Sequence, residues 1–275
     1  MRSLNFSRNM SVLSFLLLIG LLGTVIIEPL YAQDDDLTKQ AQNPVANLIS
    51  VPFQNNTIFD VGPDGGVLNV LNIQPVVPFT MNENWNLITR TIFPIVRQPE
   101  FAEGLGSKSG LGDIVLTLFL SPAKPSKFIW GAGPVFQIPS ASDERLGSEK
   151  WGIGPSFVGL YQEGPWLCGA LFNQVWSFAG EENRGDVSQA LIQPIVNYNT
   201  ASGLYFVSAP IITANWEAQN SDDKWTVPIG GGVGKLVRMG KLPVNLTAQV
   251  YYNAVKPDLM GDWSMRIQAQ FLFPK

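Results

Sequence analysis

Apolar and polar side chains alternate along this chain with a period of two, and this alternation limits the possible folds more than any other feature. In the stretch WSMRIQAQFLFPK near the C-terminus, every second residue from Met265 to Phe273 is apolar. Arg266, Gln268 and Gln270 lie between them. A strand sends successive side chains to opposite faces, so this segment predicts a ribbon with one apolar and one polar face. A soluble sandwich would bury the apolar face, whereas a membrane barrel would turn it outward.

Segments with this alternation follow one another along most of the chain. VNLTAQVYYNAV and SQALIQPIVNY are two further examples, in which amide side chains occupy one face and apolar side chains the other. Most segments are long enough for a tilted membrane strand, which needs ~9–11 residues. The approximate spans of about twelve such segments are 48–60, 66–80, 84–98, 111–121, 127–140, 151–163, 165–180, 187–199, 203–217, 224–238, 243–256 and 262–273.

The connections between these segments alternate in length. The short turns are predicted at 81–84, 121–126, 163–165, 200–202 and 239–242. The intervening loops are mostly longer, notably 98–110 and 141–150, and they collect most of the acidic residues. Outer-membrane barrels have short periplasmic turns and longer external loops. The sequence therefore predicts an all-β fold, a single antiparallel up-and-down transmembrane β-barrel of about twelve strands over residues 48–275. A soluble exported β-sandwich is the alternative, and it gives no reason for the alternation of the loops.

The N-terminus has the features of a secretory signal peptide. Arg2 and Arg8 form a positive region ahead of an apolar run. The sequence then offers a cleavage site after Ala32. Residues 1–32 are therefore predicted to be removed on export to the bacterial outer membrane through the periplasm. Residues 33–47 are predicted to form a periplasmic segment ahead of the barrel. A single membrane anchor is the alternative interpretation of the apolar run.

The composition removes the common catalytic and metal-binding arrangements. The chain contains no histidine, and Cys168 is its only cysteine. Ser-His-Asp triads, Cys-His pairs and the usual zinc sites are therefore excluded. The glycine cluster from Gly230 to Gly234 lacks the Lys-Ser/Thr pair and the helix of a phosphate loop. We expect no enzymatic activity, no catalytic, cofactor-binding or metal-binding residues, no cofactor and no nucleic-acid partner.

Prolines interrupt many of the predicted strands. A proline cannot donate to the hydrogen-bond ladder, and in sheets it is normally confined to edges and bulges. A closed barrel has no edge, so bulges or kinks are expected at these positions. The prolines concerned are Pro75, Pro78, Pro94, Pro134, Pro155, Pro194, Pro210 and Pro228.

The chain also contains an internal repeat. Residues 73–93 align without gaps with residues 192–212, and both segments begin with Ile-Gln-Pro, an aliphatic residue and Val. On the map of predicted strands, the offset between the two segments corresponds to about six strands. The repeat therefore predicts a barrel built from two similar halves.

Several motifs resemble a known family of outer-membrane proteins. The motifs are QAQNPVANLISVPFQNN, GLGDIVLTLFLSPAKP, LGSEKWGIGP, VWSFAG, PIITANWEA and WTVPIGGGVGK. They resemble the outer-membrane β-barrel transporter family named after the MetA pathway of phenol degradation, some members of which carry the misplaced label neuromedin U. The resemblance covers essentially the whole mature chain. It implies a barrel with a role in the passage of small molecules, aromatic ones among them, and it supplies no site residues.

Polar residues on the inner faces of the predicted strands are the candidate site, because a barrel would turn them toward its lumen. Arg90 and Asp113 lie on inward faces of neighbouring predicted strands. They are expected to form a structural pair, because a charge in a barrel wall needs a partner; a constriction that selects solutes is the alternative. The candidate lumen-lining residues are Arg90, Asp113, Gln189, Gln193, Asn197, Asn245, Gln249, Asn253, Arg266, Gln268 and Gln270.

These features predict a narrow channel or transporter for small solutes, hydrophobic or aromatic ones included. About twelve strands fall between the filled barrels of eight strands and the open ones of 16–18. A structural or surface-interaction barrel without transport is the alternative. The expected partners are outer-membrane lipid and lipopolysaccharide, a small-molecule solute, and the barrel-assembly machinery during biogenesis. The acidic loops predict a preference for cations or neutral solutes, whereas Arg90 at a constriction would favour anions.

Overall fold

The alternating segments form strands in the computed structural model, which describes residues 31–274 apart from 102–103, 105 and 125. The predicted signal peptide lies outside this range except for its last two residues. The elements are α2 (Tyr31–Ala41), β1 (Ile49–Val61), β2 (Gly66–Ile73), β3 (Val76–Thr80), β4 (Trp85–Gln98), β5 (Lys108–Leu111), β6 (Ile114–Pro122), β7 (Phe128–Ile138), η1 (Glu144–Leu146), β8 (Lys150–Glu163), β9 (Trp166–Gly180), β10 (Ser188–Asn199), β11 (Leu204–Ser208), β12 (Ile212–Asn215), β13 (Trp225–Met239), β14 (Leu242–Val255) and β15 (Trp263–Phe273).

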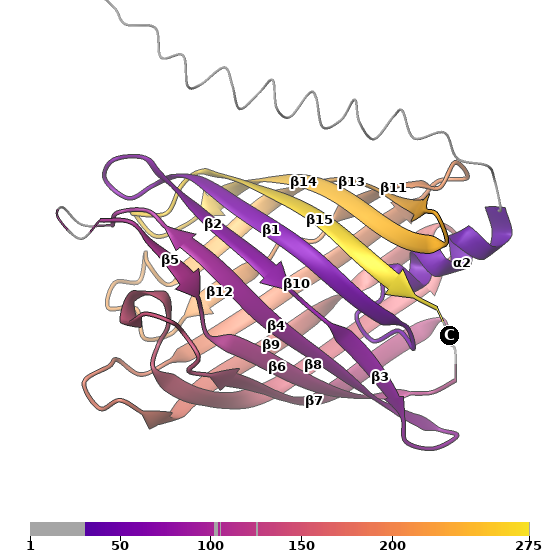
Figure 1. Cartoon of the computed structure of the whole chain (residues 1–275), viewed down its shortest axis with the longest axis horizontal. Coiled ribbons are helices and arrows are strands. Elements are labelled where there is room, and N and C mark those ends of the chain that lie inside the picture. The colour runs from indigo at the N-terminus through magenta and orange to yellow at the C-terminus, as the bar shows by residue number, and fades with distance from the viewer. Residues whose placement is uncertain (1–30, 102–103, 105, 125, 275) are drawn as a thin grey trace, which may run out of the picture. The chain divides into compact units, whose positions relative to one another are not determined.

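The strands pair into one antiparallel sheet that closes on itself (Figure 1). Successive strands pair along the chain, and the last strand, β15, pairs with the first, β1, from Ile49–Phe273 to Ile58–Ser264. Three pairs of short strands, β2 with β3, β5 with β6 and β11 with β12, each continue one another as a single interrupted wall strand. In the described residues the wall therefore consists of twelve strands, which confirms the predicted fold class.

Two of the prolines mark the interruptions of wall strands. β2 gives way to β3 at Pro75, and β11 gives way to β12 at Pro210. A third irregularity lies beside Pro228, where the register between β13 and β14 shifts. The remaining prolines lie within continuous strands, and Pro134 and Pro155 lie opposite each other on β7 and β8. Pro94 of β4 faces the break between β5 and β6, where the register shifts between the pairs Ile92–Val115 and Ile95–Leu111. The expected irregularity therefore occurs at or opposite four of these prolines, and the register shows no shift at Pro78, Pro134, Pro155 and Pro194.

The two repeated segments occupy equivalent places in the wall. Hairpin β3–β4 pairs Val77 with Thr89, and hairpin β10–β11 pairs Val196 with Ser208. These two pairs stand at matching positions in the alignment of the two segments. The second hairpin follows the first by six wall strands. The barrel therefore has two similar halves, as the repeat predicted.

Short and long connections lie at opposite ends of the barrel (Figure 1). At what we call the turn end, the connections are 81–84, 123–127, 164–165, 200–203 and 240–241. At what we call the loop end, they are 62–65, 99–107, 139–149, 181–187, 216–224 and 256–262. Helix α2 and the end of β15 also lie at the turn end. The predicted alternation of short and long connections is confirmed.

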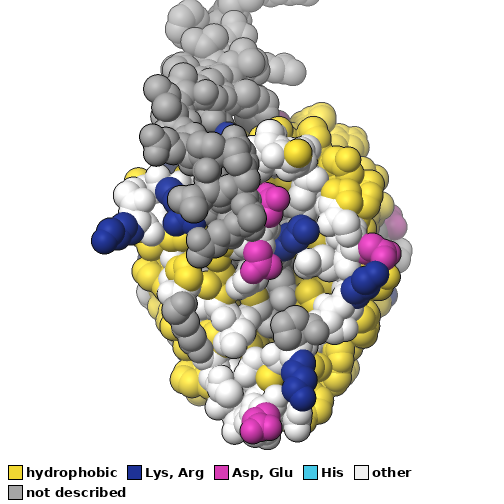
Figure 2. Space-filling view, turned by 90° about the vertical axis from the view of Figure 1, so that its right-hand side faces the viewer, with side chains coloured by type: hydrophobic (Ala, Val, Ile, Leu, Met, Phe, Trp, Pro, Cys, Tyr) yellow, Lys and Arg dark blue, Asp and Glu magenta, His cyan; other side chains and the backbone are white. Residues whose placement is uncertain are grey.

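The apolar faces of the strands point outward. Figure 2 looks onto the turn end, and hydrophobic side chains gather around the outer wall while charged side chains stand on the end face. On β6, Leu120 is 39% exposed, whereas its neighbour Phe119 is fully buried. Leu116 and Leu118 share the outward face with Leu120, because side chains alternate along a strand. The wall therefore has an apolar outer face, and the opposite face of each strand points into the barrel.

The segment ahead of the first strand packs into the turn end of the barrel. We call residues 31–48, which comprise helix α2 and the turn after it, the plug. One buried apolar cluster unites Leu37, Ala41, Ala46 and Leu48 of the plug with Leu236 of β13 and Leu272 of β15. Val45 joins a second cluster that includes Phe119 of β6. The sequence predicted residues 33–47 as a periplasmic segment ahead of the barrel, and in the structure several of their apolar side chains are buried against the inner wall.

A glycine in the wall makes room for a lumen tyrosine. Gly234 of β13 lies opposite Tyr205 of β11, whose hydroxyl donates to Asn245 Oδ1 at 2.9 Å. A methyl group at Gly234 would overlap the tyrosine ring. Overpacking costs ~1–3 kcal/mol, so Gly234→Ala should lower the temperature at which the barrel unfolds in a heat-modified gel-shift assay. Gly185→Ala is the control, because nothing lies within 4 Å of a methyl group there. Equal unfolding temperatures for the two variants would contradict the interior position of Tyr205.

Candidate functional site

The barrel interior has an apolar side and a polar side. Inward-facing residues of β4, β6, β8 and β9 form the apolar side, and they are Ile88, Phe119, Val158, Leu160, Leu167 and Leu171. Each is at most 1% exposed, so side chains fill this part of the lumen. Amide, hydroxyl and guanidinium groups of β1, β14 and β15 form the polar side. Open space inside the barrel therefore borders the polar side.

A cavity of about 150 Å³ lies between the plug and the polar side, and we call it the lumen cavity. The plug contributes Gln40, Gln42 and Asn43 to its lining. Apolar residues contribute a smaller part of the lining, among them Leu171 and Ile195. Eight of the predicted lumen-lining residues meet here: Arg90, Gln193, Asn197, Asn245, Gln249, Arg266, Gln268 and Gln270.

The other three predicted residues lie outside the lumen cavity, toward the loop end. Gln189 shares the inward face of β10 with Gln193 but is exposed to solvent. Asn253 is buried, and its Nδ2 donates to the carbonyl of Gly261 at 2.6 Å. Asp113 holds a loop, as described below. Side-chain alternation places residues on a face of a strand, but it does not give their depth in the barrel.

Arg90 is held at the first interruption of the wall. Its Nη2 donates to Gln74 Oε1 at 2.6 Å. Gln74 is buried at the junction of β2 and β3, where its backbone N–H donates to Pro52 O at 2.9 Å. The predicted Arg90–Asp113 pair does not form, because Arg90 lies opposite Thr117. Asp113 lies four residues from Thr117 along the chain, which corresponds to roughly 13 Å of strand.

Arg266 is held at the interruption between β11 and β12. Its Nη1 donates to Ala209 O at 2.7 Å, and its Nε donates to Asn56 Oδ1 at 2.9 Å. The guanidinium also lies over the ring of Tyr251, 5.2 Å from the centroid. Ala209 precedes Pro210, where the strand ladder stops, so its carbonyl needs a side-chain donor. Sequence reasoning missed Asn56 and Tyr251 as partners, and the proline was the one signal that a freed carbonyl would lie here.

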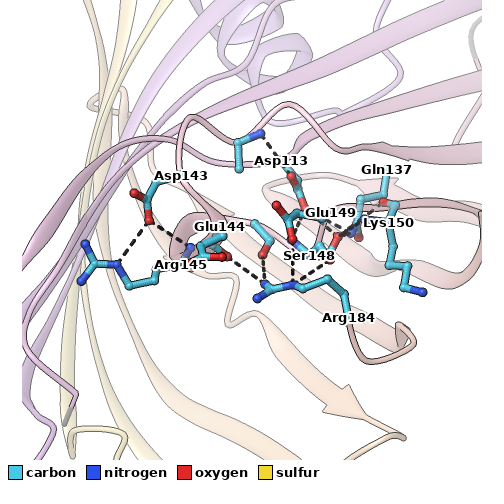
Figure 3. Close-up of polar contacts among 11 residues, drawn as sticks. Asp113, Gln137, Asp143, Glu144, Arg145, Ser148, Glu149, Lys150 and Arg184 are labelled. Atoms are coloured by element: carbon cyan, nitrogen blue, oxygen red, sulfur yellow. Dashed lines mark hydrogen bonds and ion pairs between the residues drawn. The ribbon is translucent and has the colours of Figure 1, made fainter. Parts of the chain in front are cut away.

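A loop from the loop end folds against the inner wall, and Asp113 holds it (Figure 3). We call residues 139–149 the inward loop. Asp113 Oδ2 accepts hydrogen bonds from the backbone N–H and the hydroxyl of Ser148, both at 2.7 Å. Gln137 of β7 donates to Ser148 Oγ, also at 2.7 Å. Leu146 of the same loop is buried. The sequence predicted only a long loop here.

Arg184 from the neighbouring connection ties the inward loop a second time (Figure 3). Its Nη2 donates to the carbonyls of Glu144 and Gly147 at 2.8 and 2.7 Å. Its Nε lies 3.2 Å from Glu149 Oε2. These contacts join two neighbouring connections of the loop end. Sequence reasoning missed Arg184, since nothing local distinguishes it from a solvated loop arginine.

Asp143 anchors the far side of the inward loop. Lys108 Nζ lies 2.5 Å from Asp143 Oδ2, and Asp143 Oδ1 accepts from the backbone N–H of Arg145 at 3.1 Å. The hydrogen bond from Lys108, together with that from Arg145, lowers the pKa of Asp143 to about 2. The carboxylate therefore stays ionised at all ordinary pH values.

Within the described part of the chain, no three His, Cys, Asp or Glu side chains gather as metal ligands would. The described helices include none that is long and apolar enough to cross a membrane. Cys168 is a free thiol.

Comparisons with known proteins agree with this architecture. The sequence profile of the family described as "Putative MetA-pathway of phenol degradation" matches residues 61–255. The crystal structure of an outer membrane channel from Pseudomonas putida F1 is similar, with a TM-score of 0.63, 16% identity, and coverage of 82% of this chain and 95% of that chain. At that identity the likeness concerns the fold alone. No curated protein sequence matches the chain significantly.

A second solved structure is a weaker match. The translocator domain of the autotransporter NalP from Neisseria meningitidis shares 9% identity and covers 87% of this chain and 94% of that domain. Its TM-score is 0.44, which is too low to carry an argument.

The inward loop should depend on the carboxylate of Asp113. In Asp113→Asn, one oxygen must serve donors that two charged oxygens now share, and hydrogen bonds to charged groups contribute ~1.5–3 kcal/mol each. Hydrogen exchange at the Ser148 amide should therefore become about tenfold faster or more. Asp64→Asn, an exposed carboxylate at the same end, is the control. Unchanged exchange at Ser148 would mean that Arg184 alone holds the loop.

The loop should also respond to acid. A carboxylate with a lowered pKa stabilises the folded arrangement above its unfolded pKa of ~3.9. That contribution is lost as the pH falls toward about 2, the folded pKa of Asp143. A spin label at Glu144→Cys in a Cys168→Ser background should stay immobile down to about pH 4 and gain mobility below it. Adding Asp143→Asn should remove this transition, and a transition near neutral pH would assign the response to another group.

Proposed function

The chain belongs to the family described as "Putative MetA-pathway of phenol degradation", and from that premise we propose that it forms a narrow channel for small solutes in the bacterial outer membrane. One observation carries the proposal. A cavity lined by both polar and apolar groups lies inside a closed wall whose outer face is apolar. Such a wall satisfies its backbone hydrogen bonds internally and suits a bilayer. The cavity gives a solute a place inside that wall.

The ends of the barrel supply its proposed orientation. Short turns are periplasmic and longer loops external in outer-membrane barrels, so the turn end with the plug faces the periplasm. The apolar outer wall contacts lipid, and the loop end faces lipopolysaccharide. The chain reaches this membrane through export and the barrel-assembly machinery.

The plug and the inward loop make the proposed channel a gated one. The plug closes the turn end through its apolar cluster, and Gln42 Nε2 donates to Asn199 Oδ1 of β10 at 2.7 Å. The inward loop is tied at the loop end by Asp113 and Arg184. The plug lines the lumen cavity on the side of the turn end. A solute that leaves the cavity toward the turn end must therefore displace the plug.

The proposed solutes are small molecules with apolar and polar parts, aromatic compounds among them. The family description names phenol degradation. The lumen offers Leu171 and Ile195 on one side and amide groups on the other. A compact ring with one polar substituent fits both sides.

A barrel that serves a structural or surface role without transport is the second candidate. The filled apolar side of the lumen favours it, because those side chains leave no space between them. The two candidates differ in one respect. A channel conducts when its plug is loosened, and a structural barrel does not.

Loosening the plug should therefore raise conductance. Leu37 is 7% exposed within the plug cluster, and an aspartate there must lose water or leave the cluster. Leu37→Asp should increase the open time or conductance of the full chain in planar bilayers. Asp35→Asn, on the exposed side of the same helix, should behave as the natural protein does. Silent membranes with both variants, in a preparation that shows the folded gel shift, would favour the structural role.

A further inference from the structure

Among its described lining residues, the lumen cavity has two positive charges and no negative one. Arg90 and Arg266 both line it. None of its described lining residues is acidic. The nearby carboxylates of Asp35 and Asp36 on helix α2 border other cavities at the turn end. We infer that the lumen cavity is a binding site for a small organic monocarboxylate, held between Arg90 and Arg266. This inference rests on the proposed function and specifies the solute class.

The two arginines have only neutral partners. Arg90 donates to an amide oxygen of Gln74, and Arg266 donates to an amide oxygen and a backbone carbonyl. The ion pairs of the described residues include neither arginine. A buried charge normally has a charged partner, since neutral hydrogen bonds only partly replace water. Among the described residues no anion balances the two arginines, and a bound anion would supply that balance.

Both guanidinium groups keep donors for that anion. A guanidinium carries five N–H donors. Arg90 uses one of them in its hydrogen bond to Gln74, and Arg266 uses two in its hydrogen bonds to Asn56 and Ala209. The remaining donors of each group have no partner among the described residues. Because the fork of a guanidinium matches the two oxygens of a carboxylate, a carboxylate is the anion that this arrangement suits.

The cavity sets the size and polarity of the rest of the ligand. Its volume of about 150 Å³ is that of an engineered cavity that admits benzene. Leu171, Ile195 and Val207 line it together with the arginines. A carboxylate attached to a body of one six-membered ring satisfies both the charge and the apolar lining. A bare inorganic anion would leave the apolar lining facing water.

One buried acceptor in the lumen cavity has no hydrogen-bond donor among the described residues. Asn197 lines the cavity and is 3% exposed, and its Oδ1 has no hydrogen-bond partner. Buried polar atoms in folded proteins nearly always have partners. A hydroxyl on the ligand or an ordered water in the cavity would supply the missing donor.

The interior charge reverses the selectivity expected from the loops. The acidic loops predicted cations or neutral solutes. They are exposed, however, and salt screens exposed charges within about 8–10 Å. Arg90 and Arg266 act inside a narrow, partly apolar space, where charges are screened much less. The site therefore favours anions, the alternative that the sequence offered for Arg90.

The first test measures binding to the full chain in detergent. Benzoate is the probe, and titration calorimetry is the method. Arg90→Gln should weaken benzoate binding at least about tenfold. Arg97→Gln removes the same charge from the same strand, but Arg97 lines a separate cavity, so it should bind as the natural protein does. Arg266→Lys keeps the charge without the fork and should bind with intermediate affinity. Each variant must show the folded gel shift.

The chemistry of the probe gives a second comparison. Cyclohexanecarboxylate should bind much as benzoate does, because the proposal requires an apolar ring-sized body and not aromaticity. Acetate lacks the body, and benzyl alcohol lacks the charge, so both should bind at least about tenfold more weakly. Equal binding of benzoate and benzyl alcohol, or equal binding to natural protein and Arg90→Gln, would overturn the carboxylate site.

The third measurement separates this inference from the proposed function. Reversal potentials in a salt gradient should show an anion preference that Arg90→Gln reduces and Arg97→Gln does not. Benzoate binding in a protein that never conducts would support the site and reject the channel. Conduction without benzoate binding would support the channel and reject the site.

Discussion

Closure of the hydrogen-bond ladder is the constraint on which the rest of this structure depends. β15 pairs with β1, so the wall has no free edge. Where prolines break the ladder, groups in the lumen replace the lost partners. At the break between β11 and β12, Ala209 O accepts a hydrogen bond from Arg266, and Ala209 N donates one to the hydroxyl of Tyr251. Part of the polar lining therefore exists because the wall needs it, before any solute is considered.

The same need explains why charge could collect inside the barrel. Arg90 and Arg266 each serve a broken strand, and each contact uses only part of a guanidinium. The wall thereby holds two positive groups beside one cavity, and none of the described residues that line it is acidic. The described part of the plug completes the cavity with amide groups. In our proposal, the side chains that bond to the broken strands are therefore also the ones that bind a solute.

Much of the wall could be predicted from the sequence, and the depth and partners of its polar groups could not. Side-chain alternation is a local property, so it gave the strands, their inward faces and the alternating connections. The partner of Asp113 lies in a loop 35 residues away, and no local pattern specifies such a contact. Alternation also fails on β9, where Leu167 and Leu171 face the lumen although both are apolar. The packing of the plug could not be predicted, because its few apolar residues form a core only together with Leu236 and Leu272 of distant strands.

The central claim is that the outward face of the wall is apolar and meets lipid, while the polar face of strands such as β15 is enclosed. Spin labels placed one at a time along β15, in a Cys168→Ser background in lipid vesicles, test it directly. Oxygen concentrates in the bilayer, so its collision rate with the label should alternate with a period of two. The maxima are predicted at Met265, Ile267 and Ala269, and the minima at Arg266 and Gln268. Maxima at the polar positions, or no alternation at all, would contradict the account.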